Sequence, residues 1–440
     1  TATSLKFATG NAVGEPVLVA GGRDGAAGSA IGAFEIYEPD SGAFVAGPAG
    51  GHARFAHSAT LIADDTVMIA GGIDGSPRDT CQLYTYPNTV AACGNSMSSA
   101  RAYHSATLLP TGEVLIAGGM NATQNADNTG VLFDPTNGNQ FADISPSSVS
   151  SSTMLVARMR HTATVVPGPE PGDVHVVLTG GTNGQAEGQF WNVIDIYQDK
   201  FSGQAPRPRG FDVQGSPVNM NESRADHTAT RLPTGDVVLA GGRDGGGAHA
   251  TAERCVYDPA DHSFSFVAIG TMLDARQGHA ALLVNAGYNV AAGRAVLVAG
   301  GSNAAAPNAA LDEAELLVRS NGEPCSLDAQ CLSGICVLAP TTADPDRHIC
   351  CDDRCDEQCK SCSGAVNLAS DGQCANIDDG LTDDPATEAW TTCEADLPKQ
   401  DFVEIHTVCD GLGSPKVIRS FSCKPSTCNA DSSACSEGCR

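Results

Sequence analysis

The stretch RAYHSATLLPTGEVLIAGGM, residues 101–120, decides the fold because the chain repeats it. Equivalent stretches begin at Arg54, Arg158, Arg224 and Arg276, and a sixth glycine pair at residues 21–22 lacks the upstream Arg and His. The second glycine of each pair falls at residues 22, 72, 119, 181, 242 and 301. A period near fifty residues with strand-like content predicts a repeat array.

One copy of the repeat predicts four short strands. HSATLL alternates as a half-buried strand does, PTG at 110–112 and again at 233–235 is turn chemistry, and EVLIAGG completes a hairpin. A third strand is expected in FEIYEP, GVLFDP, VIDIYQ and RCVYDP, and a fourth around Phe44, Phe141 or Phe264. Four antiparallel strands repeated radially form a blade of a β-propeller, and neighbouring blades complete each blade's core.

The order R-x-x-H-[ST]-A-T, hydrophobic strand, Gly-Gly, x-[DN] and Tyr-[DE]-Pro resembles the Kelch repeat over residues 1–320. One departure is that phenylalanine replaces the usual fourth-strand tryptophan or is itself absent, and Trp191 is the only Trp of this region. The resemblance implies an all-β fold with a six-bladed Kelch-type propeller. The sixth blade runs out at AELLV, so we expect either three strands there or a fourth supplied by the tail.

The Arg and His of the repeat are predicted to be scaffolding. Five copies of one catalytic pair in a single chain are implausible, whereas buried Arg and His that hydrogen-bond backbone between blades explain the recurrence. The residues concerned are Arg54, His57, Arg101, His104, Arg158, His161, Arg224, His227, Arg276 and His279.

Composition limits the partners and the compartment. The formal net charge of −26 over 440 residues argues against a nucleic-acid partner, which basic patches would bind. The longest apolar stretches are far too short to span a bilayer, and no signal-peptide pattern opens the chain. Fifteen of the 18 cysteines lie after residue 320, which is typical of a disulfide framework made in an oxidising compartment. We therefore expect an exported protein, secreted or on the cell surface.

Residues 321–440 are predicted to form a small, loop-dominated domain stapled by disulfides. A division into two modules, 321–375 and 376–440, is the alternative. This region has 21 acidic and 8 basic residues, a net charge of −13, and few large apolar side chains. The runs CSLDAQCLSGIC, ICCDDRCDEQCKSCSG and CNADSSACSEGC resemble cysteine-rich modules of exported myxobacterial-type surface proteins. That resemblance implies an extracellular setting and no particular chemistry.

Two metal hypotheses apply to the same region. CKSC at 359–362 lacks a second pair at the spacing of a zinc site, so zinc is disfavoured. The acidic run NIDDGLTDDP at 376–385 could hold calcium through Asp378, Asp379, Asp383 and Asp384. It lacks the spacing of a known calcium loop, so a solvated acidic loop is the preferred interpretation, and no other cofactor is expected.

A catalytic site is not expected. Copper radical oxidases resembling galactose oxidase use a Kelch propeller, and they need a Cys–Tyr crosslink, a second Tyr and two His. Here Tyr37, Tyr197 and Tyr257 occupy a repeated third-strand position, and Cys255 lies two residues before Tyr257. That spacing favours packing on one face over a copper site. Histidines outside the repeat form no ligand spacing, and motifs of the common hydrolases and nucleotide enzymes are absent.

An Asp or Asn follows each glycine pair after one intervening residue, at Asp24, Asp74, Asn121, Asn183, Asp244 and Asn303. The simpler interpretation is an Asx-turn leading into the third strand. The alternative is a ring of six Asx side chains on the face that also carries the long interblade loops, where propellers place recognition.

Two predictions concern cysteines of the repeat region. Cys81 and Cys93 flank an expected hairpin of the second blade, so a disulfide between them is predicted. The position of Cys255 holds Glu35, Val131 and Asp195 in other repeats, so it tolerates polar side chains, and we expect Cys255 to be reachable and bonded to a tail cysteine. The alternatives are an intermolecular bond from the tail and a buried, reduced Cys255.

Three functions remain. The preferred one is an exported, non-catalytic recognition or adhesion module that binds protein or glycan at a cell surface through a propeller face. The second is a structural subunit of a surface fibre or coat that self-associates, motivated by the odd number of tail cysteines. The third is a propeller oxidase.

Overall fold

The computed structural model describes residues 1–317 except 7–13, 26–27, 146–149, 169–171, 185–187, 200–208, 213–217, 259–262, 286–293 and 304–309. Beyond residue 317 it describes seven strands only. Residues 1–281 and 299–315 form one compact unit, and residues 282–298 and 316–440 form a second.

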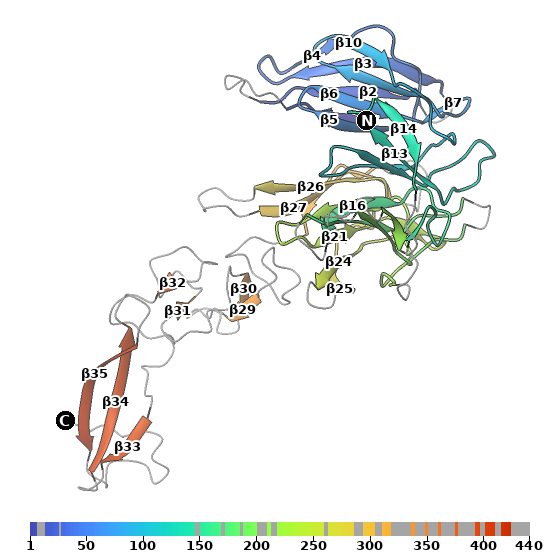
Figure 1. Ribbon diagram of the computed structural model, residues 1–440. Helices are drawn as coiled ribbons and strands as arrows, with labels where there is room; N and C mark the ends of the chain where they lie inside the picture. Colours follow the sequence, from blue (N-terminus) through green and yellow to red (C-terminus); the bar gives the residue numbers. More distant parts are fainter. Residues whose placement is uncertain are drawn as a thin grey trace. The chain divides into compact units, whose positions relative to one another are not determined.

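The first three sheets are four-stranded antiparallel meanders (Figure 1). The first contains β1 (Ala2–Ser4), β2 (Val17–Arg23), β3 (Ala30–Glu38) and β4 (Ala43–Ala46). The second contains β5 (Ser58–Ala63), β6 (Thr66–Ala70), β9 (Cys81–Thr85) and β10 (Thr89–Ala92), with a small hairpin of β7 (Ile73–Asp74) and β8 (Ser76–Pro77) after its glycine pair. The third contains β11 (Ser105–Leu108), β12 (Val114–Ala117), β13 (Gly130–Asp134) and β14 (Gln140–Asp143).

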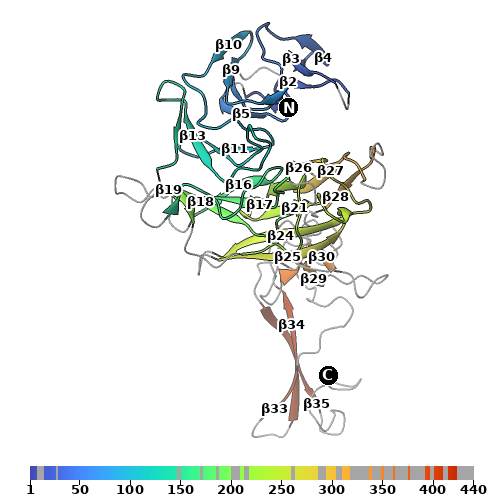
Figure 2. The same cartoon turned by 90° about the vertical axis from the view of Figure 1, so that its right-hand side faces the viewer.

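The remaining sheets vary this plan. The fourth contains β16 (Thr162–Pro167), β17 (Val174–Thr179), β18 (Asp195–Asp199) and β19 (Arg209–Asp212), and β15 (Ser150–Ser151) adds a fifth strand at its edge. The fifth contains β20 (Thr228–Arg231), β21 (Val237–Ala240) and the long hairpin of β24 (Thr251–Asp258) and β25 (Ser263–Thr271), visible in Figure 2, with β22 (Arg243–Asp244) and β23 (Gly247–Ala248) as a side hairpin. The sixth has three described strands, β26 (Ala280–Asn285), β27 (Arg294–Ala299) and β28 (Ala314–Leu316).

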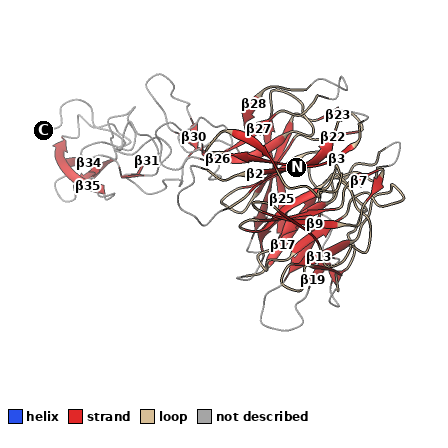
Figure 3. Cartoon of the chain, turned by 90° about the horizontal axis from the view of Figure 1, so that it is seen from above, coloured by secondary structure: helices blue, strands red, loops and turns tan. Residues whose placement is uncertain are grey.

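The six sheets are the blades of a β-propeller, as the sequence predicted. The first strands β1, β5, β11, β16 and β20 contact one another in succession, so the innermost strand of each of these blades faces the axis. All described elements are strands (Figure 3). In the part of the chain that the structure describes, no helix is long and apolar enough to cross a membrane.

The hydrophobic core lies between blades. One cluster joins Met68 and Leu83 of the second blade to Ile116 and Phe133 of the third, and similar clusters join blades one and two, three and four, and four and five. Each blade thus buries its faces against its neighbours, which is why one repeat alone would expose both.

The glycine pair makes the close contact between blades possible. Gly118 has φ +61°, and a Cβ on it would lie 2.5 Å from the backbone oxygen of Arg158 in the next blade. The N–H of Gly119 donates to that same oxygen at 2.9 Å, and the second glycines of blades one, two, four and five do likewise. Only glycine allows both the left-handed backbone and this approach.

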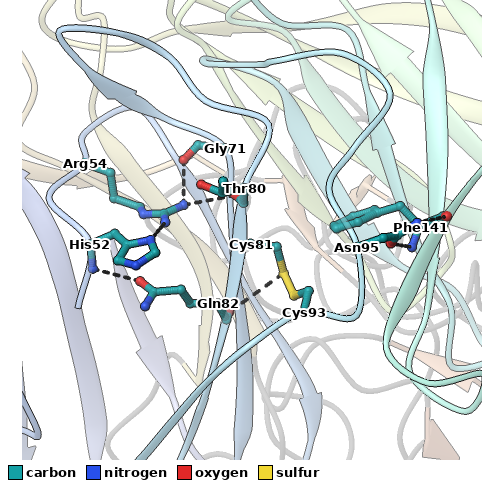
Figure 4. The surroundings of a disulfide bond; sticks show 9 residues. All are labelled: His52, Arg54, Gly71, Thr80, Cys81, Gln82, Cys93, Asn95 and Phe141. Carbon is teal, nitrogen blue, oxygen red and sulfur yellow. Dashed lines mark hydrogen bonds between the residues drawn. A yellow bond between two sulfur atoms is a disulfide. The ribbon is translucent and has the colours of Figure 1, made fainter. Parts of the chain in front are cut away.

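Cys81 and Cys93, the pair expected from the sequence, form a disulfide with Cα atoms 5.4 Å apart (Figure 4). Cys81 opens β9 and Cys93 follows β10, and these strands pair directly. The bond therefore closes the outer hairpin of the second blade.

Cys255 corrects the expectation of a tether to the tail. It is a free thiol, 2% exposed, so the position is not reachable from outside. The strand register explains the error, because Cys255 pairs with Val237 where Phe133 pairs with Val114 and Tyr197 with Val176. β24 runs two residues further before its turn, so Cys255 occupies the buried aromatic position of the third strand. The position shared by Glu35, Val131 and Asp195 belongs to Glu253.

The cysteine-rich region contains β29 (Cys336–Leu338) paired with β30 (His348–Cys350), and β31 (Lys360–Ser361) paired with β32 (Ala375–Asn376). A three-stranded sheet follows, with β33 (Thr392–Asp396), β34 (Asp401–Cys409) and β35 (Pro415–Cys423). The calcium candidates Asp378, Asp379, Asp383 and Asp384 lie outside the described residues.

Candidate binding site at the mouth of the propeller

The repeat arginines brace their own blades. In each, Nη1 donates to the carbonyl of the blade's first glycine, as Arg101 does to Gly118 at 2.9 Å. Acidic side chains compensate the buried charge. Asp195 Oδ2 lies 2.5 Å from Arg158 Nη2, and Glu253 Oε1 lies 2.9 Å from Arg224 Nη2. The side chain therefore bonds within a blade, and the arginine backbone bonds between blades through its carbonyl and its N–H, which refines the expected role.

The repeat histidines join neighbouring blades through hydroxyl groups. Nε2 of His104 lies 2.9 Å from the Ser58 hydroxyl, and Nε2 of His161 lies 2.9 Å from that of Ser105. His57, His227 and His279 make the equivalent hydrogen bond to the preceding blade. Burial, and then the adjacent repeat arginine, lower the pKa of His104 to about 3. These five histidines are neutral structural links.

The residue immediately before each repeat histidine has a left-handed backbone conformation. Ala56, Tyr103, Arg160 and Asp226 have φ between 54° and 58°, and the sixth blade places Gly278 there with φ 61°. Each of their N–H groups, from Tyr103 to Gly278, donates to the carbonyl of the equivalent residue in the preceding blade at 2.9–3.0 Å. We call these five residues the mouth ring, since they link successive blades where the innermost strands begin.

Two mouth-ring side chains form an ion pair that extends to the next loop. Arg160 Nη1 donates to Asp226 Oδ1 at 3.0 Å, and Arg243 Nε, from β22, donates to Asp226 Oδ2 at 2.9 Å. The Arg160 guanidinium also stacks 3.8 Å from the Tyr103 ring centroid, and that of Arg243 lies 5.4 Å from the Phe190 centroid. Asp226 thus links two guanidinium groups, each of which lies over an aromatic ring.

Four of these side chains line a cavity of about 570 Å³, which we call the mouth cavity: Tyr103, Arg160, Phe190 and Arg243. Its other lining residues include Met120, Met159, Thr182 and Asp244. A second cavity of about 490 Å³ shares Arg160 and is lined by Asp226, Gln277, Gly278, Gly301 and Ser302. Concave sites with an apolar wall and a few converging polar groups are where proteins bind ligands.

The Asx residues proposed as a binding ring mostly serve their own loops. Asn121 Oδ1 accepts from the N–H groups of Thr123 and Asn125, Asn183 Oδ1 accepts from Gln189, and Asp74 pairs with Arg78 at 2.5 Å. Only Asp244 lines either of the two cavities described above. Asp24 and Asn303 lie in the equivalent loops of the first and sixth blades.

The mouth-ring residues were missed because the repeat was treated as constant. Within R-x-x-H the residue before His is Ala, Tyr, Arg, Asp and Gly in turn, while its flanking Arg and His never change. A position that varies chemically inside a constant frame was the available signal. Of the described residues, no group of three or more His, Cys, Asp or Glu side chains is placed to hold a metal ion.

Comparisons with known proteins give little beyond the fold. No family model matches the chain, and no curated protein matches it. Among solved structures, YjhT superposes over 68% of this chain and 91% of its own, at 14% sequence identity and a TM-score of 0.46. The class defined by the architecture and site described above is a six-bladed β-propeller with a lined cavity at its mouth.

Proposed function

We propose that the protein is an exported, non-catalytic recognition module that binds its partner in the mouth cavity. One observation carries the proposal: Tyr103, Arg160 and Asp226 adopt a left-handed backbone that costs a side-chain-bearing residue about 1–2 kcal/mol, although Gly278 shows that glycine fits the same position. Strain of this kind is typical of functional sites. The side chains of Tyr103 and Arg160 line the mouth cavity, and Asp226 bonds Arg160 from the adjoining cavity, which supports recognition.

The repeat type, the type of the cysteine-rich tail and the compartment are inferred from the sequence and from one disulfide. The repeat order supports a Kelch-type propeller, and the tail supports a surface protein of the myxobacterial type. The Cys81–Cys93 disulfide supports an oxidising compartment, since such bonds are rare in reducing ones. Neutral, buried repeat histidines support a non-catalytic role for the five Arg–His pairs.

The test is binding of the labelled full chain to cells of the producing organism, to extracellular proteins and to a glycan array. The Arg160→Gly, Arg243→Gln double variant removes both cavity cations, while Ala56→Gly changes the same ring position without removing a functional group. We expect the wild type and Ala56→Gly to bind one class of target and the double variant to lose it. Equal binding by all three would show that the mouth is not the site, and stoichiometric copper in the purified protein would support an oxidase instead.

A second candidate is a subunit of a surface fibre or coat. Cys255 is free and buried, so the fifteen cysteines after residue 320 cannot all pair with one another. A remaining thiol could bond to a second chain. Ordered polymers in electron micrographs, dispersed by reductant, would favour this function over solitary recognition.

A further inference from the structure

We propose that the mouth cavity binds an acidic peptide segment, with Arg243 holding a carboxylate side chain and the methionine and aromatic wall packing an adjacent apolar one. This rests on the proposed function, because it names the ligand of the same site.

Arg243 has guanidinium hydrogen-bond donors that are available to a ligand. Its side chain is 32% exposed, and its Nε is occupied by Asp226. Among the described residues, its two terminal amino groups have no recorded partner. These groups form one edge of the guanidinium, which matches a carboxylate in a bidentate hydrogen bond. Phe190 beneath the guanidinium keeps that edge in place.

Asp226 positions Arg243 rather than repelling the ligand. Each of its two oxygens accepts from a different arginine, so one carboxylate orients two guanidinium groups. Asp226 and the two arginines together carry one net positive charge, which Asp244 of the mouth cavity offsets. The donor edge of Arg243, rather than a net positive charge, is therefore what selects an anion here.

The cavity wall favours a peptide over a small anion. Met120, Met159, Tyr103 and Phe190 line the same space as the arginines, and Met, aromatic residues and Arg are the types enriched in protein interfaces. Methionine also adapts its shape to irregular apolar side chains. A volume of about 570 Å³ is larger than one carboxylate needs, and the adjoining cavity at Arg160 offers Gln277 and Ser302 to peptide backbone.

The experiment compares two acidic residues near Arg243, Asp226 and Asp244. Asp244 lines the mouth cavity, yet its Oδ1 accepts from Gly246 N–H, and among the described residues it pairs with neither Arg160 nor Arg243. The probe is an array of blocked peptides with Glu or Asp beside Leu, Phe or Tyr, with a matched array carrying Gln or Asn instead. Uronic-acid oligosaccharides form a third arm, and affinities of the best peptides are measured by calorimetry.

We expect acidic peptides to bind and their amide counterparts to bind at least about tenfold more weakly, the usual value of one charge-assisted hydrogen bond. Asp226→Asn should weaken binding about tenfold, because the amide NH₂ would face one guanidinium. Asp244→Asn removes the same charge and should leave affinity equal or higher. Arg243→Gln should abolish the preference for acid over amide.

Three results would overturn the proposal. Equal binding of acidic and amide peptides, or binding of uronic-acid oligosaccharides alone, would refute the peptide ligand. If Asp226→Asn strengthened peptide binding as much as Asp244→Asn does, the positioning role of Asp226 would be refuted. If cells or surface proteins are still bound through the mouth while the arrays show no acid preference, only the ligand class fails. If the wild type bound no cell, extracellular protein or glycan, the proposed function itself would be overturned.

Discussion

Replacing Gly118 with Ala tests whether blade contact, and not only backbone conformation, requires the glycine pair. The new Cβ would lie 2.5 Å from the Arg158 carbonyl oxygen and 2.8 Å from His161 Cε1. That carbonyl cannot simply move away, because it accepts the Gly119 N–H at 2.9 Å. The substitution therefore strains one residue and separates two blades.

The expected loss is about 3 kcal/mol in the free energy of unfolding. The left-handed backbone accounts for about 1–2 kcal/mol. Weakening a buried hydrogen bond and leaving its carbonyl unsatisfied accounts for about 1–3 kcal/mol more. Reduced freedom of the unfolded chain returns about 0.4–1 kcal/mol.

Gly42→Ala is the matched control. Gly42 has φ +65°, and a Cβ there meets no atom within 4 Å, so this variant has the backbone cost without the contact. Urea unfolding of the full chain, followed by circular dichroism, compares the two midpoints at equal slope. We expect Gly118→Ala to lose about 1–3 kcal/mol more than Gly42→Ala. Equal losses would refute the argument that the glycine pair sets blade spacing.

Three further outcomes follow from the same structure. Ala56→Gly should raise the free energy of unfolding by about 0.5–1 kcal/mol, measured by urea titration, because it relieves φ 54° at a position without other side-chain function. Removing the disulfide with Cys81→Ala and Cys93→Ala should cost about 2–3 kcal/mol, and an unchanged midpoint would contradict this. The repeat histidines have lowered pKa values, about 3 for His57 and about 4 for His279. The unfolded chain therefore binds more protons below pH 6.5, and stability should fall from there down to about pH 3, by up to about 2 kcal/mol per histidine at pH 5. A flat stability between pH 7 and pH 5 would show that these histidines are not buried neutral.

The blades were predictable because their constraints are local. A Gly-Gly pair after an alternating strand has few other uses, and five copies of R-x-x-H placed the innermost strands of blades two to six. Strand register across a blade was less predictable, because it depends on hairpin length. Two extra residues in β24 moved Cys255 from a half-polar position into the aromatic one, and the letters RCVYDP alone aligned it wrongly.

The sequence places the candidate binding residues, the six Asx side chains, in the loops after the glycine pairs, and their binding role stays a prediction. Asn121 and Asn183 accept hydrogen bonds from their own loops, as the Asx-turn interpretation expects, and Asp244 lines the mouth cavity. Under the proposed function, the binding residues differ between repeats, because the mouth cavity is lined by residues of several blades. In the mouth ring, the backbone is the same in five blades, while the side chains change from Ala56 to Tyr103, Arg160, Asp226 and Gly278. In a repeat propeller, the positions that share a backbone and differ in chemistry are therefore where a binding site should be sought.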